Sequence, residues 1–209
     1  PCAGLNETNK KRAGVWAHDY RNSLIAADAH MYDDDTQVLI TVDTIEHAFR
    51  LQQYLPEFQL VYSGAQYTPA DWAWYRREGI LPEGFQPLTE ERKQAMTRRF
   101  ERGKLKKVIA TTVWNVGVNF KGLQVLIRAD ASGSPINDTQ VPGRTSRLDE
   151  SVDKSCGIIH DYRDMFDLGY KQKYKGREAS YTRNGWKQYY PKDGKQSLLR
   201  RLLQEGKQV

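Results

Sequence analysis

The chain has 209 residues, 39% of them hydrophobic, which is enough for one domain with a buried core and extensions. It contains no run of about 18 apolar residues and opens without an apolar segment, so we expect neither a transmembrane helix nor a signal peptide. The net charge of +6 is uneven, because residues 170–209 carry eleven lysines and arginines against three acidic residues.

The two cysteines indicate a reducing compartment. Cys2 and Cys156 are far apart in the sequence, and neither has a neighbour typical of a metal or redox site. We therefore expect two free thiols in a cytoplasmic protein. The chain begins with Pro1 rather than methionine, from which we expect a piece of a longer protein.

The first elements are a helix and a buried strand. Residues 8–31 are predicted to form one helix, capped by Asn6 or Thr8, because apolar residues recur at helical spacing. The apolar run at 38–42 (Val-Leu-Ile-Thr-Val) is typical of a strand in the middle of a parallel sheet.

A second helix and strand follow, and then an irregular segment. Thr44 can cap a helix that runs to about residue 54, and a strand is predicted at 60–62. Residues 65–88 fit the pattern least, and we interpret them as an insertion with one helical turn. The insertion contains two tryptophans that we expect to pack rather than to stack on bases, Trp72 and Trp74.

The alternation of helices and strands continues towards the C-terminus. Thr89 is predicted to start a helix that ends near residue 102, with Gly103 as its stop. Apolar runs predict further strands at 107–111, 124–127 and 157–160. Strands that alternate with helices indicate an α/β fold, in which a parallel sheet is flanked by helices.

The C-terminal region is basic and rich in aromatic residues over 170–192, and a closing helix is predicted at 195–205. Lysines such as Lys173 and Lys175 can neutralise phosphates, and an aromatic ring such as that of Trp186 can stack on an unpaired base. The alternative is that the aromatic residues pack on the domain while the lysines solubilise it.

Residues 110–119 carry the first of two motifs with chemical content. The segment begins at the end of an apolar strand, where open parallel sheets bind ligands. Thr111 and Thr112 offer hydroxyl groups, and Gly117 lets the backbone approach a ligand or a partner domain. The alternative is a strand followed by an ordinary helix cap.

Residues 140–147 (Gln-Val-Pro-Gly-Arg-Thr-Ser-Arg) carry the second motif. Arg144 and Arg147 are three residues apart, so on a helix they share a face, and Gly143 leaves the backbone before them uncrowded. Arginines supplied across a domain interface stabilise the transferred phosphoryl group, and Gln140 can orient the same groups. The alternative is a pair of surface arginines.

In this order and at this distance, the two segments resemble motifs V and VI of superfamily 2 helicases. The resemblance implies a second RecA-like motor domain over 35–169, entered by a linker helix at 1–34 and followed by the basic aromatic extension at 170–209. The linker, with Tyr20-Arg21-Asn22, is similar to that of phage UvsW-type DNA helicases, which implies a bacterial or phage-infected cell.

Further positions follow from the same resemblance. Val38–Asp43 resembles motif IV, and Ser63 with Gly64 resembles the strand-end turn that contacts the nucleic-acid backbone. Asn119 stands where the family often has an acidic residue that contacts the nucleotide ribose, and Val141 stands where it often has Arg or His. These two departures put one charge-based contact to the nucleotide and one polar contact across the cleft in doubt.

The sequence lacks a phosphate-binding loop of the form Gly-x-x-x-x-Gly-Lys-Ser/Thr. The resemblance therefore implies that ATP with Mg²⁺ binds between this domain and an N-terminal RecA-like domain that supplies the Mg²⁺ ligands, and that this chain alone does not hydrolyse ATP. The implied function is the C-terminal half of an ATP-dependent helicase or translocase on DNA, with RNA as the other candidate polymer.

A second hypothesis remains open at this point. The chain could instead be a non-catalytic nucleic-acid-binding module, in which a RecA-like scaffold carries a basic aromatic tail. Such a module would lose affinity steeply as the salt concentration rises.

Overall fold

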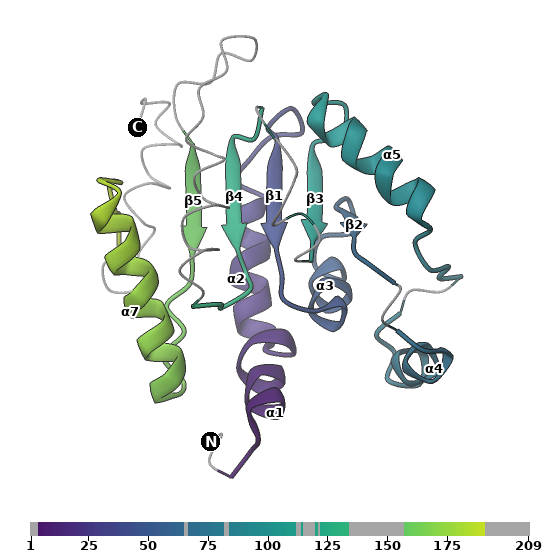
Figure 1. The fold of residues 1–209 in the computed structure, drawn as a ribbon, viewed down its shortest axis with the longest axis horizontal. Coiled ribbons are helices and arrows are strands. Elements are labelled where there is room, and N and C mark those ends of the chain that lie inside the picture. Colours follow the sequence, from purple (N-terminus) through teal and green to yellow (C-terminus); the bar gives the residue numbers. More distant parts are fainter. Residues whose placement is uncertain are drawn as a thin grey trace.

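The computed structural model describes residues 4–64, 67–81, 84–111, 114, 120, 122–133 and 157–190. At its centre lies a sheet of five parallel strands in the order β2-β3-β1-β4-β5 (Figure 1). The strands are Val38–Thr41 (β1), Gln59–Val61 (β2), Lys107–Ala110 (β3), Val125–Arg128 (β4) and Ile158–Asp161 (β5). This confirms the predicted α/β class with its parallel sheet.

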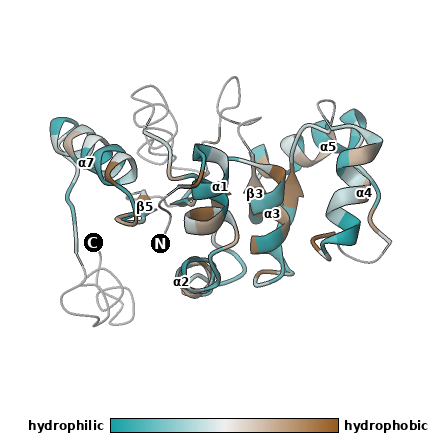
Figure 2. Cartoon of the chain, turned by 90° about the horizontal axis from the view of Figure 1, so that it is seen from below, coloured by the Kyte–Doolittle hydropathy of each residue, from teal (hydrophilic) through white to brown (hydrophobic). Residues whose placement is uncertain are grey.

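Helices cover both faces of the sheet, with α2 on one face and α5 and α7 on the other (Figure 2). The helices are Glu7–Lys11 (α1), the π-helix Arg12–Trp16 (η1), Asp19–Ala29 (α2), Ile45–Gln52 (α3), Pro69–Arg77 (α4), Glu90–Glu101 (α5) and Leu168–Arg183 (α7). No helix in the described ranges is both long and apolar enough to cross a membrane.

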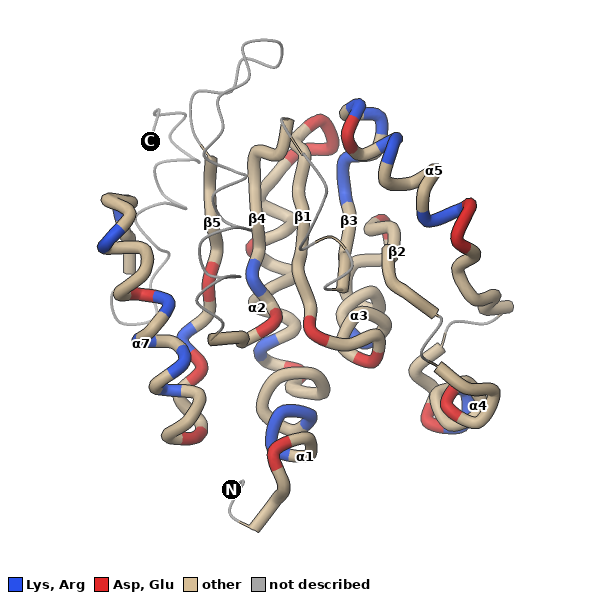
Figure 3. The backbone as a smooth tube through the Cα atoms, viewed as in Figure 1, with Lys and Arg blue, Asp and Glu red and all other residues tan. Residues whose placement is uncertain are grey.

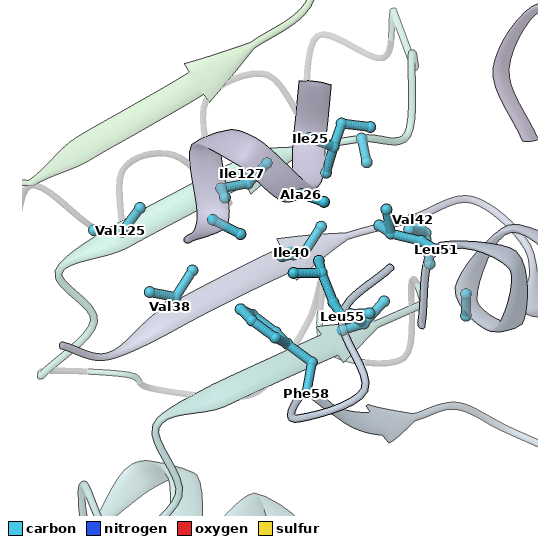
Figure 4. Close-up of a cluster of buried hydrophobic side chains, with 14 residues drawn as sticks. Ile25, Ala26, Val38, Ile40, Val42, Leu51, Leu55, Phe58, Val125 and Ile127 are labelled. Carbon is cyan, nitrogen blue, oxygen red and sulfur yellow. The ribbon is translucent and has the colours of Figure 1, made fainter. Parts of the chain in front are cut away.

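The core follows from the alternation of side chains along the strands. Val38 and Ile40 of β1 point to the face covered by α2 and α3, where they pack with residues such as Ile25 and Leu51 (Figure 4). Leu39 points to the other face, which α5 covers through Phe100. Burying each such aliphatic side chain stabilises the fold by about 1.5–3 kcal/mol, so both layers are held mainly by apolar contact.

The helix starts predicted for α3 and α5 are confirmed. The hydroxyl of Thr44 accepts a hydrogen bond from the amide of His47, and that of Thr89 accepts one from the amide of Arg92. Gly103 follows α5 with a φ of +66°, a conformation that glycine adopts without steric cost.

The prediction of one helix over residues 8–31 is wrong, because the structure divides this region into α1, η1 and α2. Asn6 caps α1, and the ring of His18 caps α2 by accepting from the amide of Arg21 at 3.2 Å. The π-turn between them brings Gly14 against the ring of Phe166. Apolar spacing alone does not reveal this break, since the contact comes from a residue far along the chain.

The insertion contains more regular structure than the single turn predicted. Helix α4 has nine residues, and it starts with a capping box between Thr68 and Asp71. Trp72 and Trp74 pack, together with Tyr75, into an apolar cluster on α3, which agrees with the packing role expected for both indoles.

The basic aromatic segment begins as a long helix on the sheet. Helix α7 buries Tyr170, Tyr174, Arg177 and Tyr181, so residue 170 lies inside an element of the folded domain. Removing residues 170–209 would therefore remove part of the core as well as a set of positive charges.

Gly14 and Gly176 offer a matched test of the packing around η1. A Cβ at Gly14 would overlap the ring of Phe166, whereas a Cβ at Gly176 in α7 would meet no heavy atom within 4 Å. We expect Gly14→Ala to lower the free energy of unfolding by about 1–3 kcal/mol. We expect Gly176→Ala to raise it by about 0.5–1 kcal/mol, because alanine favours the helix. Urea denaturation of both variants checks this, and equal effects would rule out the close approach at Gly14.

Candidate functional site

The carboxyl ends of the strands form the edge at which open parallel sheets bind ligands. Ser63 and Gly64 follow β2 at this edge, and Thr111 follows β3. The amide of Thr111 donates to the carbonyl of Val61 at 3.0 Å, which extends the pairing of the two strands. The structure thus brings these predicted nucleic-acid contacts to neighbouring strand ends.

Aromatic side chains support the turn at Ser63 and Gly64. A Cβ at Gly64 would lie 3.9 Å from the rings of Trp72 and Tyr62. The hydroxyl of Tyr62 accepts a hydrogen bond from the amide of Leu88 at 3.0 Å, and burial raises the pKa of this tyrosine. The insertion therefore braces the turn, while Ser63 itself stays partly exposed.

The other described candidates lie at the opposite side of the sheet. Lys173 and Lys175 are on α7, which packs against β5, whereas Ser63 and Gly64 follow β2 at the other edge. The ammonium of Lys173 lies 4.2 Å from the ring of Tyr170, and Trp186 stacks on Tyr181 at a centroid distance of 5.6 Å. Lys175 is exposed. The predicted contacts therefore form two separate groups.

The remaining predicted site residues lie outside the described part of the chain. They are Thr112, Gly117, Asn119, Gln140, Gly143, Arg144 and Arg147. Their nearest described neighbours in sequence are Thr111 at the end of β3 and the segment 129–133 that follows β4.

A buried network of charged side chains follows β4 and β5, and sequence reasoning missed it. Arg128 ends β4 and is 2% exposed. Its guanidinium lies 3.3 Å from Asp130 and donates to the hydroxyl of Tyr181 at 3.0 Å. Asp130 also accepts from the hydroxyl of Thr41 at 3.1 Å, which connects the network to the central strand.

The network continues through Asp161, which pairs with Arg128 in the register of β4 and β5. One oxygen of Asp161 accepts from Nε of Arg177 and from the hydroxyl of Tyr181, each at 2.8 Å. Arg177 also donates to the carbonyl of Ser132 at 2.7 Å. Helix α7 thereby holds the backbone that leaves β4.

A third arginine reaches the network from the opposite face. Arg21 of α2 makes a two-pronged ion pair with Asp164, with Nε at 2.7 Å and Nη2 at 3.2 Å from its oxygens. Its third nitrogen donates to the carbonyl of Ala129 at 3.0 Å. Asp164 also lies 3.8 Å from Arg177, so this carboxylate meets arginines from both helical layers.

The surroundings of Arg128 and Asp130 set the pKa of each group. Burial by itself lowers the pKa of Arg128, but Asp130, Tyr181 and Asp161 outweigh it and raise the pKa above its ordinary value. Burial by itself raises the pKa of Asp130, but Arg128 and the amide of Ser132 outweigh it and lower the pKa. Both groups remain charged at neutral pH, as a satisfied buried ion pair requires.

The N-terminal segment docks beside β1 through further ion pairs. Lys11 lies 2.8 Å from Asp43, directly after β1, and Arg12 pairs with the buried Glu46 of α3 at 2.9 Å. The guanidinium of Arg12 also lies over the ring of Trp74 at 5.4 Å. These contacts fix the segment that enters the domain to the start of α3.

His47 is fully buried behind this docking contact. Its Nε2 lies 3.2 Å from the amide oxygen of Asn22, whose nitrogen donates to the carbonyl of Trp16, so Nε2 carries the proton and donates. Burial, followed by the positive charge of Arg21, lowers the pKa of His47 well below its ordinary value. The ring is therefore neutral in the folded domain at neutral pH.

The described residues contain no group of three His, Cys, Asp or Glu side chains that could hold a metal ion.

Comparison with known proteins identifies the family. Residues 22–149 match the model of the helicase conserved C-terminal domain, which covers more than half of the chain. The chain belongs to this family. The match contains β1 to β4 and both sequence motifs, and it places the chain among the C-terminal domains of superfamily 2 helicases. A search of curated proteins finds no match.

Solved structures agree with this helicase C-terminal domain in fold. The S. cerevisiae Dbp5 C-terminal domain bound to Gle1 and IP6 is similar with a TM-score of 0.52 at 13% identity, with 81% of each chain covered. S. cerevisiae Dbp5 bound to RNA and ADP BeF3 is similar with a TM-score of 0.50 at 15% identity. That alignment covers 81% of this chain but 37% of the Dbp5 chain, so the helicase domain described here corresponds to a part of it.

The buried network extends beyond the matched residues of the helicase domain. Arg128 and Asp130 lie within the match, whereas Asp161, Asp164 and Arg177 lie after it. The signal in the sequence is an arginine or aspartate placed at the carboxyl end of an apolar strand, at Arg128 and Asp161. This pattern does not reveal which side chain pairs with each of them, because Arg177 and Tyr181 come from a helix further along the chain.

Arg177 offers a test of the network. Arg177→Gln removes a buried guanidinium and leaves Asp161, whose side chain is 10% exposed, without its main counter-charge, so we expect the free energy of unfolding to fall by about 3 kcal/mol. Arg183→Gln removes an exposed arginine from the end of the same helix and should change it by less than about 0.5 kcal/mol. Chemical denaturation measures both variants, and similar values for the two would show that the network does not stabilise the domain.

His47 predicts a pH dependence of stability. The pKa of His47 in the folded domain lies below the value of about 6.5 in the unfolded chain, so the unfolded chain binds more protons in acid. The free energy of unfolding is therefore unaffected by His47 above about pH 6.5 and falls as the pH decreases below that value. The loss approaches about 1.4 kcal/mol per pH unit. We expect His47→Gln to weaken this dependence between pH 7 and 5, and His30→Gln, at an exposed site, to leave it in place. An unchanged slope in His47→Gln would contradict the assignment.

Proposed function

We propose that this domain is the C-terminal motor half of an ATP-dependent superfamily 2 helicase or translocase that acts on DNA. The observation that carries the proposal is the family match, because residues 22–149 include both motif segments. In this proposal ATP with Mg²⁺ binds between the domain and an N-terminal RecA-like domain, which supplies the Mg²⁺ ligands.

Arginines and small residues of the two motifs serve the nucleotide in this proposal. Arg144 and Arg147 place positive charge on the phosphates from across the cleft, and Gln140 orients the same groups. Gly143 and Gly117 let the backbone approach, and Asn119 donates or accepts a hydrogen bond at the ribose. These donors suit a triphosphate, which needs guanidinium and amide groups more than it needs acid–base chemistry.

The backbone of one nucleic-acid strand passes over the ends of β2 and β3 in this proposal. Ser63, Gly64, Thr111 and Thr112 contact its phosphates, which positions the strand without reading its sequence. Support comes from the hydrogen bond between Thr111 and Val61, which places these strand ends side by side. Lys173, Lys175 and Trp186 supply a second group of contacts from the other side of the sheet.

The buried network anchors the backbone that precedes the second motif. Arg21 holds the carbonyl of Ala129, and Arg177 holds that of Ser132, so two helices fix the segment from which residues 140–147 continue.

Arg144→Ala in the longest natural protein that contains this chain tests the motor. We expect nucleic-acid-stimulated ATP hydrolysis to fall by about 10³-fold or more, with nucleic-acid binding retained, because the arginine acts on the phosphates. Arg76→Ala, at an exposed position of α4, is the matched control.

Two results would count against the proposal. If Arg144→Ala keeps ATP hydrolysis within a few-fold of the unaltered protein, the arginine has no role at the phosphates. If the unaltered protein hydrolyses no ATP with either single-stranded DNA or RNA, the domain is a binding module. A comparison of the two polymers at saturating concentration identifies the preferred one.

A further inference from the structure

A cluster of basic side chains lies at the end of the sheet that faces away from the candidate site. It comprises the C-terminal part of α5 and the turn into β3, with Arg98, Arg99, Arg102, Lys104 and Lys106. Figure 3 shows lysine and arginine positions gathered where α5 ends and β3 begins. We call these five residues the amino-edge basic surface, because they lie where β3 begins.

The positive charge of this surface is not neutralised within the described part of the chain. Arg98, Arg99, Arg102 and Lys104 are exposed, Lys106 is partly exposed, and none of the five forms an ion pair with a described residue. Neighbouring cations differ, since Lys93 pairs with Glu90 at 2.6 Å and Lys107 donates to the carbonyl of Tyr32 at 2.8 Å. Glu101 is the single acidic residue between positions 98 and 107.

Folding alone does not account for this arrangement. Positive charge in the last turn of a helix interacts favourably with the helix dipole, which explains part of the preference for arginine in α5. However, Arg98 lies four residues before Arg102, the C-cap of α5, and like charges at this spacing repel. Lys104 and Lys106 lie beyond the helix, in the turn into β3.

The chemistry of the surface favours a polyphosphate over a protein partner. Protein interfaces need apolar or aromatic anchors at their centre. The exposed large hydrophobic residues of the described ranges lie elsewhere, at Leu5, Tyr20, Leu24, Met165, Leu168 and Tyr190. Several exposed cations without such an anchor match the phosphate backbone of a nucleic acid, whose sequence-independent binding is electrostatic.

We propose that the amino-edge basic surface binds a second stretch of nucleic-acid backbone, separate from the strand held at the carboxyl ends. The sheet separates the two regions, because a strand of four residues spans about 13 Å between its ends. The surface binds phosphates independently of sequence and keeps the flanking part of the polymer close to the domain. The identity of the polymer as DNA rests on the proposed function.

The test uses the longest natural protein that contains this chain and a fluorescently labelled single strand of thymidylates with a duplex of matched length. One variant combines Arg98→Gln with Arg102→Gln, and a second combines Lys104→Gln with Lys106→Gln, outside the helix. The matched control combines Arg76→Gln with Arg77→Gln, which removes two exposed helical arginines from α4. Affinity is measured over a series of salt concentrations.

We expect both test variants to weaken binding of at least one polymer by about tenfold at low salt and to reduce the slope of log affinity against log salt by about 1.4–1.8. The control should retain the slope. Maximal ATP hydrolysis at saturating nucleic acid should not change, because the surface lies away from the nucleotide.

Other outcomes would overturn the proposal. Salt slopes equal to that of the control would show that the surface does not bind nucleic acid. Unchanged affinity for nucleic acid, together with lost binding of an acidic protein, would show the same. A protein without ATP hydrolysis but with the expected salt slopes would instead reject the motor and keep the second contact, so the two failures are distinguishable.

Discussion

The structure depends on the pairing of one buried carboxylate with arginines from both helical layers. Asp164 lies just past β5, where Arg21 from α2 and Arg177 from α7 approach it over the edge of the sheet. A buried charge is tolerated only when it is paired and hydrogen-bonded, so neither helix can leave without exposing an uncompensated charge. The apolar core holds each layer to the sheet, and this ion pair holds the two layers to each other.

That constraint makes the ends of the described chain part of one unit. Arg21 lies before the residues that match the family, and Arg177 lies after them, yet both donate to carbonyls in the segment 129–133. The segment that leads towards Arg144 and Arg147 is therefore fixed from two sides. The two guanidinium groups thereby hold the backbone at Ala129 and Ser132 in one geometry relative to the sheet.

The sequence predicts the elements whose signals are local. The apolar runs of β1 and β4 are continuous, and threonine caps mark the starts of α3 and α5, so strands and helices were placed within a few residues. The network could not be predicted, because Arg128 and Asp161 become neighbours only when β4 pairs with β5. The packing of Phe166 against Gly14 could not be predicted for the same reason, since the two residues are about 150 positions apart. The roles of Arg144 and Arg147 rest on the family resemblance, because both residues lie outside the described part of the chain.

The net charge of a long segment does not show where its individual charges lie. Residues 1–169 are nearly neutral as a whole, which draws attention to the C-terminal segment, yet one of its arginines, Arg177, is buried and internally paired. Conversely, the amino-edge basic surface lies in the near-neutral part, where acidic residues elsewhere cancel it in the sum. The environment of each cation differs: Arg177 faces a carboxylate at 2.8 Å in the interior, whereas Arg98 and Arg102 are exposed to water. Counting charges along the sequence locates neither Arg177 nor the amino-edge basic surface. The role of each cation depends on the groups that surround it.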